Sequence, residues 1–382
     1  MRNDTMKELK KKNNKSRISL YEPLIGKKEK LYVNDCLNTN WISSRGKYVK
    51  LFEDKFKNYI NIKYAVAVNN GTAALHVALL ALGIGKKDEV ITPTFTYIAT
   101  ANSINYVGAT VKFVDSKKTS WQIDEDKISN QITSRTKAIL VPHIYGQACE
   151  MNKIKQICKK NKLFLIEDCA EAFGSYYRNK HVGTFGDVST FSFFGSKTIT
   201  TGEGGMVITN NYKIAEKVER LKMVGNDKDK YYWHNIVGYN YRMTNLCAAI
   251  GYGQLSRAKF ILKKKRNIFQ IYKKNLINLP ISLHEEYPNT THSYWLISIM
   301  VNNELIRDKL RNYLNNLNIE TRPAFYPIHT MPMYYNKKYK NKFPVATQLG
   351  KRGVNLPSGP LLTKKDILFI CSKIKQFFYK KN

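Results

Sequence analysis

Lys197 is the residue of this chain whose setting points most directly to chemistry. It follows an apolar, aromatic-rich run that begins at Phe191, and three glycines follow within eight residues. A lysine among buried aromatic residues is partly desolvated, which destabilises its ammonium and makes the neutral amine available. Such an amine condenses with an aldehyde, which is how pyridoxal phosphate is held as a Schiff base. Because the chain is rich in lysine, a solvated surface lysine remains the alternative for this segment alone.

A second segment offers backbone N–H groups to an anion. Residues 64–82 are typical of a short buried strand, a turn and an amphipathic helix. The free N–H groups of Gly71, Thr72 and Ala73 at the helix start would bind a phosphate, and the Thr72 hydroxyl would add a donor. Many capped helices begin in this way and bind nothing, so the segment is a weak signal by itself.

A third segment places carboxylates at the end of a strand. The apolar run 162–166 ends in Glu167 and Asp168, at the edge where open α/β sheets bind their ligands. A buried carboxylate there would keep a pyridine nitrogen protonated, which makes the ring an electron sink. The alternative is that Asp168 caps the following turn, and this segment does not decide between the two interpretations.

Two aromatic residues open the predicted helix within residues 89–102. Either Phe95 or Tyr97 could lie flat against a cofactor ring. Packing in the core is the simpler interpretation, and we favour it for Phe95.

The elements that must position these residues alternate between strands and helices. The alternation predicts βαβ units and a mostly parallel sheet. The predicted strands lie near 64–68, 89–93, 110–114, 137–142, 162–166, 187–193 and 204–209, and the helices near 71–82, 97–106, 124–132 and 151–160. One long helical pattern, 244–275, leads to a remainder with strands near 293–301 and helices near 303–317 and 364–379.

Together these segments resemble the sugar aminotransferases of the DegT/DnrJ/EryC1/StrS family. The resemblance runs from about Ser19 to the end of the chain, and five segments carry it in the family's order: 70–76, 167–172, 183–205, 238–245 and 321–329. It implies an α/β protein of the type I (aspartate) aminotransferase fold. We expect a basic tail at 1–18, a large pyridoxal phosphate-binding domain at 19–250 and a smaller α+β domain at 251–382.

The resemblance also implies roles at the cofactor. Lys197 matches the lysine of the Schiff base, Asp168 the partner of the pyridine nitrogen, and Tyr97 the aromatic residue stacked on the ring. Glu171 falls where relatives place glutamine, histidine or glutamate beside the ring hydroxyl. Gly71, Thr72 and Ser192 resemble the phosphate cradle.

Other roles extend beyond one subunit's cofactor. Asn245 resembles the residue that completes the phosphate cradle from the neighbouring subunit, so the resemblance implies a homodimer with shared active sites. Arg322 and His329 lie where relatives contact the nucleotide-sugar.

The activity that the resemblance implies is transfer of an amino group from L-glutamate to C4 of a nucleotide-linked 4-keto-6-deoxyhexose. Residues 41–49 and 321–332 most resemble members that act on a GDP-linked sugar. A UDP- or dTDP-linked 4-keto-6-deoxyglucose, giving a viosamine-type product, is the alternative. Outside this class, a basic nucleic-acid-binding protein or a regulatory relative without catalysis would need no such set of lysine, aspartate and glycine.

The composition of the chain limits which classes of protein fit these interpretations. The net charge of +34 would suit a nucleic-acid partner, but no nucleic-acid-binding motif is visible, and enrichment in lysine, asparagine and isoleucine is typical of an AT-rich genome. No apolar run reaches the roughly eighteen residues that span a bilayer. Six cysteines without a Cys-x-x-Cys pair predict reduced thiols and a cytoplasmic protein. Seven histidines without metal-ligand spacing predict no catalytic metal.

Overall fold

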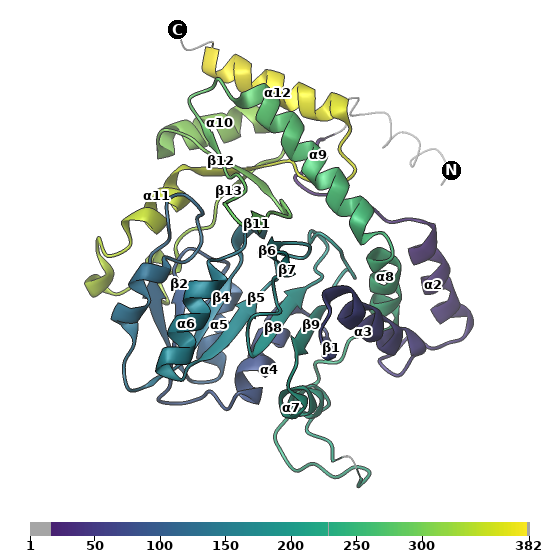
Figure 1. Cartoon of the computed structure of the whole chain (residues 1–382). Helices are drawn as coiled ribbons and strands as arrows, with labels where there is room; N and C mark the ends of the chain where they lie inside the picture. Colours follow the sequence, from purple (N-terminus) through teal and green to yellow (C-terminus); the bar gives the residue numbers. More distant parts are fainter. Residues whose placement is uncertain (1–16, 228, 380–382) are drawn as a thin grey trace.

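A mostly parallel sheet is the centre of the computed structural model, which describes residues 17–227 and 229–379 (Figure 1). Its seven strands run in the order β1 (Tyr64–Val68), β9 (Gly205–Thr209), β8 (Val188–Ser192), β5 (Phe164–Asp168), β4 (Thr136–Pro142), β2 (Glu89–Pro93) and β3 (Thr110–Val114). β9 pairs antiparallel with both neighbours, whereas the other pairs are parallel. This architecture confirms the predicted fold class.

Apolar side chains are buried on both faces of this sheet. Leu140 and Ile166 pack on one face, and their neighbours Ile139 and Leu165 pack on the other. Strands buried on both faces carry continuous apolar runs, as β4 does over 138–142 and β5 over 164–166. The helices over the first face are α4 (Gly71–Ala81), α5 (Ile98–Tyr106) and α7 (Tyr212–Lys222), and those over the second are α3 (Lys47–Ile60), α6 (Met151–Asn161) and α8 (Asn245–Leu255).

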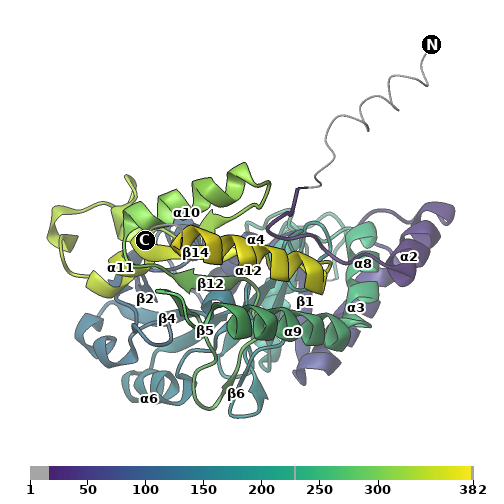
Figure 2. The same ribbon diagram turned by 90° about the horizontal axis from the view of Figure 1, so that it is seen from above.

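A second sheet lies above the first in Figure 1 and is antiparallel throughout. Its order is β10 (Ser282–Leu283), β12 (Ile297–Met300), β14 (Gly353–Leu356) and β13 (Arg322–Pro323). Figure 2 shows α12 (Lys364–Tyr379) alongside α9 (Ala258–Leu276) over this sheet, with α10 (Glu304–Asn316) and α11 (Pro344–Arg352) beyond. A small sheet of β11 (Thr290–Thr291), β6 (Tyr176–Tyr177) and β7 (Lys180–His181) joins segments of the two parts.

The long helix predicted over 244–275 is two helices, α8 and α9. The chain bends at Ser256 and Arg257, where the Arg257 guanidinium pairs with the buried Glu29 carboxylate at 2.7 Å. α8 packs against α2 (Lys27–Asn38) and α3, whereas α9 packs against α12. The change of packing partner therefore lies just beyond the predicted domain boundary at residue 250, and the boundary itself stays a prediction.

Two other segments differ from their predicted form. The helix expected over 124–132 is a pair of short 3₁₀ turns, Glu125–Lys127 and Ser129–Gln131, because Asp124 caps the first turn and serine and asparagine favour turns over helix interiors. Residues 1–16 of the predicted basic tail lie outside the described residues. The tail's end is anchored, since the Ile18 N–H donates to the Asn318 carbonyl at 2.8 Å.

In the part of the chain that the structure describes, no helix is both long enough and apolar enough to cross a membrane. All six cysteines are free thiols.

Candidate active site

A cavity of about 520 Å³ lies between the edge of the large sheet and the second sheet. The large sheet contributes the carboxyl ends of β5 and β8 and the start of α4, and the second sheet contributes the segment around β13. Eight of the predicted residues line it: Gly71, Thr72, Tyr97, Asp168, Glu171, Ser192, Lys197 and Arg322. Ala73, Asn245 and His329 are not among the lining residues. Cavities of this size hold small-molecule ligands.

Lys197 lies in a turn after β8, closed by its own N–H, which donates to the Phe194 carbonyl at 2.9 Å. Its Nζ lies 3.8 Å from the centroid of the Trp295 ring. Burial lowers the pKa of Lys197 below the ordinary value for lysine, and the charges of Glu171 and Asp168 oppose that shift. Desolvation therefore makes the neutral amine easier to reach, as a Schiff-base lysine requires.

Two side chains from outside the turn fix the backbone that carries Lys197. The Tyr21 hydroxyl donates to the Lys197 carbonyl at 2.9 Å, and the Trp295 indole N–H donates to the Ser196 carbonyl at 2.7 Å. Sequence analysis identified neither residue. Both are far from Lys197 in sequence, and a tryptophan before a strand also suits simple core packing.

Asp168 caps the following turn, which is one of the two interpretations that the sequence left open, and its role beside a ring nitrogen stays a prediction. Its Oδ1 accepts the Ala170 N–H at 3.1 Å, as a cap does, and its Oδ2 accepts the Thr100 hydroxyl at 2.9 Å. Each carboxylate oxygen can accept a further hydrogen bond, so the group can still face a protonated ring nitrogen. Burial raises the pKa of Asp168, and the hydrogen bonds from Ala170 and Thr100 counter that shift.

Glu171 is the second carboxylate beside Lys197. Its Oε2 accepts the Tyr145 backbone N–H at 2.7 Å. Burial raises the pKa of Glu171 to about 7, although the charge of Lys197 lowers it. The Glu171 carboxyl can therefore bind or release a proton near neutral pH.

The start of α4 fits a phosphate group. The Asn70 Oδ1 caps the helix by accepting the Ala73 N–H at 2.7 Å, while Gly71 and Thr72 precede it as first-turn donors. A Cβ at Gly71 would lie 2.7 Å from the Ser192 Cβ, so only glycine lets the helix start approach β8 this closely. The Ala73 N–H is already used by the cap, and its place in the phosphate cradle stays a prediction.

The two candidate aromatic residues have different environments. Phe95 is fully buried in the core, which confirms the interpretation favoured from the sequence. Tyr97 is 55% exposed, lines the cavity and lies 5.8 Å from the Phe325 ring between centroids. Tyr97 is therefore the residue placed to cover a ring bound in this cavity, and its stacking role stays a prediction.

The two residues predicted to contact the sugar lie in different places. Arg322 lines the cavity and pairs with the Glu320 carboxylate at 3.5 Å. The His329 ring is held away from the cavity surface by Thr94, whose Oγ1 lies 2.8 Å from the histidine Nδ1. A sugar contact by His329 stays a prediction.

Asn245 is buried at the start of α8, outside its own subunit's cavity. Its Oδ1 accepts the Tyr48 N–H at 2.8 Å, and its Nδ2 donates to the Cys36 sulfur and the Trp41 carbonyl. A Cβ at Gly46 would lie 2.1 Å from this side chain, so the loop before α3 closes directly over it. A contact with a partner's phosphate stays a prediction.

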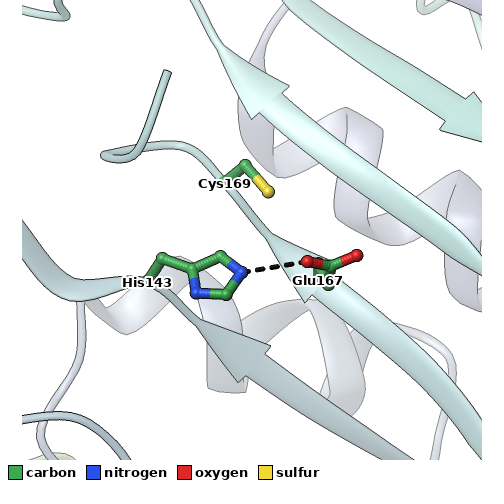
Figure 3. Close-up of side chains that lie close together, drawn as sticks. All are labelled: His143, Glu167 and Cys169. Atoms are coloured by element: carbon green, nitrogen blue, oxygen red, sulfur yellow. Dashed lines mark hydrogen bonds and ion pairs between the residues drawn. The ribbon is translucent and has the colours of Figure 1, made fainter. Parts of the chain in front are cut away.

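His143, Glu167 and Cys169 form the one group in the described ranges whose ligand atoms lie close enough to share a metal ion (Figure 3). The His143 and Glu167 atoms are already engaged in hydrogen bonds. The His143 Nδ1 accepts the Cys149 N–H, so its Nε2 carries the proton that faces the Glu167 Oε2 at 3.1 Å. Glu167 also accepts three backbone N–H groups from residues 183–186.

This arrangement anchors the 183–186 loop and orients His143 beside Asp168. Burial raises the pKa of the Cys169 thiol well above its ordinary value, so the free thiol stays protonated at neutral pH. The expectation that catalysis needs no metal stays a prediction.

The fold is that of the pyridoxal phosphate-dependent aminotransferases. Residues 23–375 match the DegT/DnrJ/EryC1/StrS aminotransferase family, so the chain belongs to that family, as the sequence motifs predicted. Its membership makes it a nucleotide-sugar transaminase.

Individual relatives agree along nearly the whole chain. GDP-perosamine synthase of Escherichia coli O157:H7 is 52% identical over 94% of this chain and 98% of its own. GDP-perosamine synthase of Vibrio cholerae is 49% identical over 94% of this chain and 99% of its own. Among solved structures, an aminotransferase from Psychrobacter cryohalolentis is 30% identical with a TM-score of 0.87, over 94% of this chain and 98% of that one.

Changing Lys197 to Ala should abolish turnover, because no other lysine among the described residues lines the cavity. Borohydride reduction of the cofactor-loaded protein, followed by peptide mass spectrometry, should place the cofactor on Lys197 in the wild type and on no residue in the variant. Lys263→Ala, at an exposed lysine of α9, is the control and should be trapped like the wild type. A covalent adduct in the Lys197→Ala protein would place the Schiff base elsewhere.

Changing Asp168 to Asn should leave the cofactor bound but lower kcat at least about 100-fold, roughly 3 kcal/mol, because a neutral amide does not stabilise a protonated pyridine. The amide oxygen can still accept from Thr100, so the fold should persist. Asp115→Asn is the control, since Asp115 is equally buried and does not line the cavity. Near-normal turnover of Asp168→Asn would leave Asp168 as a cap only.

Proposed function

We propose that this protein transfers an amino group from L-glutamate to C4 of a GDP-linked 4-keto-6-deoxyhexose. The product would be GDP-perosamine or a close stereoisomer, a precursor of glycans such as O-antigen. One observation carries this choice of substrate: relatives named GDP-perosamine synthase are 52%, 49% and 43% identical and match 98–99% of their own lengths. A cavity that joins Lys197, Asp168 and Glu171 to Arg322 supports the same reaction.

Each of these cavity residues would have a distinct role in transamination. Pyridoxal phosphate, when bound, supplies an electron sink for the charge that develops at the reacting carbon. Gly71, Thr72 and Ser192 would hold its phosphate, and Asp168 would keep its ring nitrogen protonated. Lys197, with a lowered pKa, would remove the proton from the glutamate α-carbon and later deliver a proton to C4 of the sugar.

Glu171 and Tyr97 complete the proposed site. The Glu171 carboxyl, with a pKa of about 7, would keep a proton in place for the ring hydroxyl beside Lys197. Tyr97 would cover one side of the ring and exclude water from it. Arg322 would pair with the diphosphate or the sugar at the open side.

We also propose that the enzyme is a homodimer in which each active site is shared. Asn245 lies outside its own cavity, as the shared arrangement needs. The loop between α7 and α8 projects from the body in Figure 1 and exposes several large hydrophobic side chains, among them Tyr232 (84%), Trp233 (52%) and Val237 (86%). Exposed apolar side chains gathered on one projecting loop favour burial against another surface.

A cytoplasmic location and the absence of a specific nucleic-acid partner belong to the same proposal. Six free thiols favour a reducing compartment. The charge of +34 would then serve at most to attract the anionic nucleotide-sugar.

Turnover with L-glutamate and a panel of GDP-, UDP- and dTDP-linked 4-keto-6-deoxy sugars tests the substrate. We expect the GDP-linked sugar to have the highest kcat/KM, by at least about tenfold, the difference that ~1.4 kcal/mol of transition-state binding produces. The amino sugar is measured by mass spectrometry. Equal or better use of a UDP- or dTDP-linked sugar would contradict the choice of GDP. A protein whose visible absorption does not change with glutamate would not be an active transaminase.

Mixing two inactive variants tests the shared site. Asn245→Asp would put a carboxylate beside the phosphate dianion and expel the cofactor, and Lys197→Ala removes the amine. In a mixed dimer both lesions fall in one site and the other site is intact, so activity should rise above that of either parent after subunit exchange.

Folding must be checked first, because Asn245→Asp also removes the N–H groups that hold Trp41 and Cys36. Circular dichroism and thermal unfolding of each parent serve as that control. If the mixture stays inactive after exchange proven by mass-tagged subunits, Asn245 does not serve a partner's site.

A further inference from the structure

Tyr145 is a buried residue that does not line the cavity and yet has a strained backbone. It lies in the 3₁₀ turn Ile144–Gly146 after β4, is 0% exposed and has a φ of 57°. A bulky aromatic residue seldom adopts this left-handed conformation, and surrounding contacts must hold it there. Gly146 follows with a φ of 100°, and a Cβ there would lie 2.4 Å from the Ser293 Oγ.

Three hydrogen bonds of Tyr145 lead to residues of the cavity, while other faces of its ring pack on Phe95, Trp121 and His284 in the core. Its N–H donates to the Glu171 Oε2 at 2.7 Å, and its carbonyl accepts the Trp295 N–H at 3.0 Å. Its hydroxyl oxygen accepts the Phe325 N–H at 2.9 Å. Glu171, Trp295 and Phe325 all line the cavity, and they come from three separate segments of the chain.

The ring of Tyr145 contacts two of the same residues, Phe325 and Trp295. It stacks on Phe325 with centroids 5.0 Å apart and on Trp295 with centroids 6.1 Å apart, each at an interplanar angle of 22°. One side chain thus lies between the two walls of the cavity and contacts both.

The two walls belong to different parts of the reaction. Trp295 lies against the Lys197 amine, and the Glu171 charge acts on that amine. Phe325 follows Arg322 and precedes the exposed Tyr326, so it belongs to the wall from the second sheet that the proposed function assigns to the nucleotide-sugar. Tyr145 is the buried link between the amine and that wall.

The hydroxyl remains protonated at physiological pH. Burial and the nearby Glu171 charge raise the pKa of Tyr145 above its ordinary value, although hydrogen bonds from Asn355 and Phe325 oppose the shift. Removing the hydroxyl would leave the Phe325 N–H without its acceptor, and an unpaired, partly buried N–H favours movement of the segment that carries it.

We propose that Tyr145 is a positioning residue that fixes residues 324–326 relative to Lys197, so that its hydroxyl supports binding of the nucleotide-sugar but not reaction with the amino donor. This proposal rests on the proposed function, because it assigns that wall to the sugar substrate.

The test compares Tyr145→Phe with Tyr272→Phe in the cofactor-loaded enzyme. Tyr272 is equally buried, its hydroxyl donates to the Pro357 carbonyl at 3.0 Å, and it does not line the cavity. In Tyr145→Phe we expect the KM for the GDP-linked sugar to rise about tenfold, the change that ~1.4 kcal/mol produces, while the single-turnover rate with glutamate stays within about twofold. Tyr272→Phe should change neither quantity.

Hydrogen exchange gives a readout that does not depend on activity. The Phe325 amide should exchange faster in Tyr145→Phe than in the wild type and at the wild-type rate in Tyr272→Phe. Unchanged sugar KM and unchanged exchange in Tyr145→Phe would overturn the proposal. Similar losses of rate in the reaction with glutamate and in the reaction with the sugar would also overturn the proposal, because a general structural role of Tyr145 predicts both losses. If Tyr145→Phe does not fold, Tyr145 is needed for the fold as a whole, and the selective role is rejected.

Failure of the proposed function is distinguishable from failure of this inference. A wild-type enzyme that reacts with glutamate but with no nucleotide-sugar rejects the substrate assignment. Faster exchange of the Phe325 amide in Tyr145→Phe would still support the role of the hydroxyl in holding this wall.

Discussion

The site depends on keeping one lysine amine desolvated beside two carboxylates. Burial disfavours the charged form of Lys197, and the charges of Asp168 and Glu171 favour it, so the pKa of Lys197 is the balance of opposing effects. The same burial raises the pKa of both carboxyl groups. A lysine with water around it would remain an ammonium, and one without nearby carboxylates would have no partner for the proton that it carries.

The mostly parallel sheet creates this balance by bringing distant segments to one edge. β5 ends at Asp168 and β8 ends at Ser192, and the two strands are neighbours in the sheet. Their carboxyl ends therefore place the acid and the lysine turn side by side. Gly71 lets the start of α4 approach that edge, which adds backbone donors without adding a charge. The second sheet closes the cavity with side chains such as Trp295 and Phe325, which keep water away from the amine.

The sequence predicted the parts of the site that lie in short local motifs. Asp168 at a strand end and the glycine at a helix start are local patterns, and the structure brings them to one cavity with Lys197. The preference for Phe95 as a core residue was correct, because its surroundings are apolar on every side. Sequence analysis did not find Tyr21, Trp295 and Tyr145, because their roles arise from hydrogen bonds to residues far away in sequence. Their own neighbours carry no corresponding pattern.

Two other features of the structure depend on polar contacts. A pattern of apolar residues does not reveal such contacts. The helix start that was expected to offer three N–H groups uses that of Ala73 in its own cap, with the Asn70 side chain as the acceptor. The break between α8 and α9 follows from an ion pair of Arg257 with Glu29, whose partner lies more than two hundred residues earlier. The apolar periodicity of the sequence alone predicts an unbroken helix through Ser256 and Arg257.

The buried Lys265 shows that a desolvated lysine amine need not face the cavity. Lys265 lies in a run of three lysines on α9, where the sequence suggests a solvated surface, and it is 0% exposed. Burial lowers the pKa of Lys265 to about 7. Its Nζ donates to the carbonyls of Trp295 and Ser358, so the amine is enclosed by backbone acceptors and does not line the cavity.

Lys197 differs from Lys265 in what surrounds its amine. Its neighbours are the face of an aromatic ring, two carboxylates and open space for a ligand. Lys265 binds the backbone of Trp295, whose ring lies beneath Lys197, so its amine acts on the wall of the cavity rather than on a substrate. Access to the cavity, added to desolvation, therefore distinguishes Lys197 from Lys265 and supports the proposal that Lys197 is the catalytic amine.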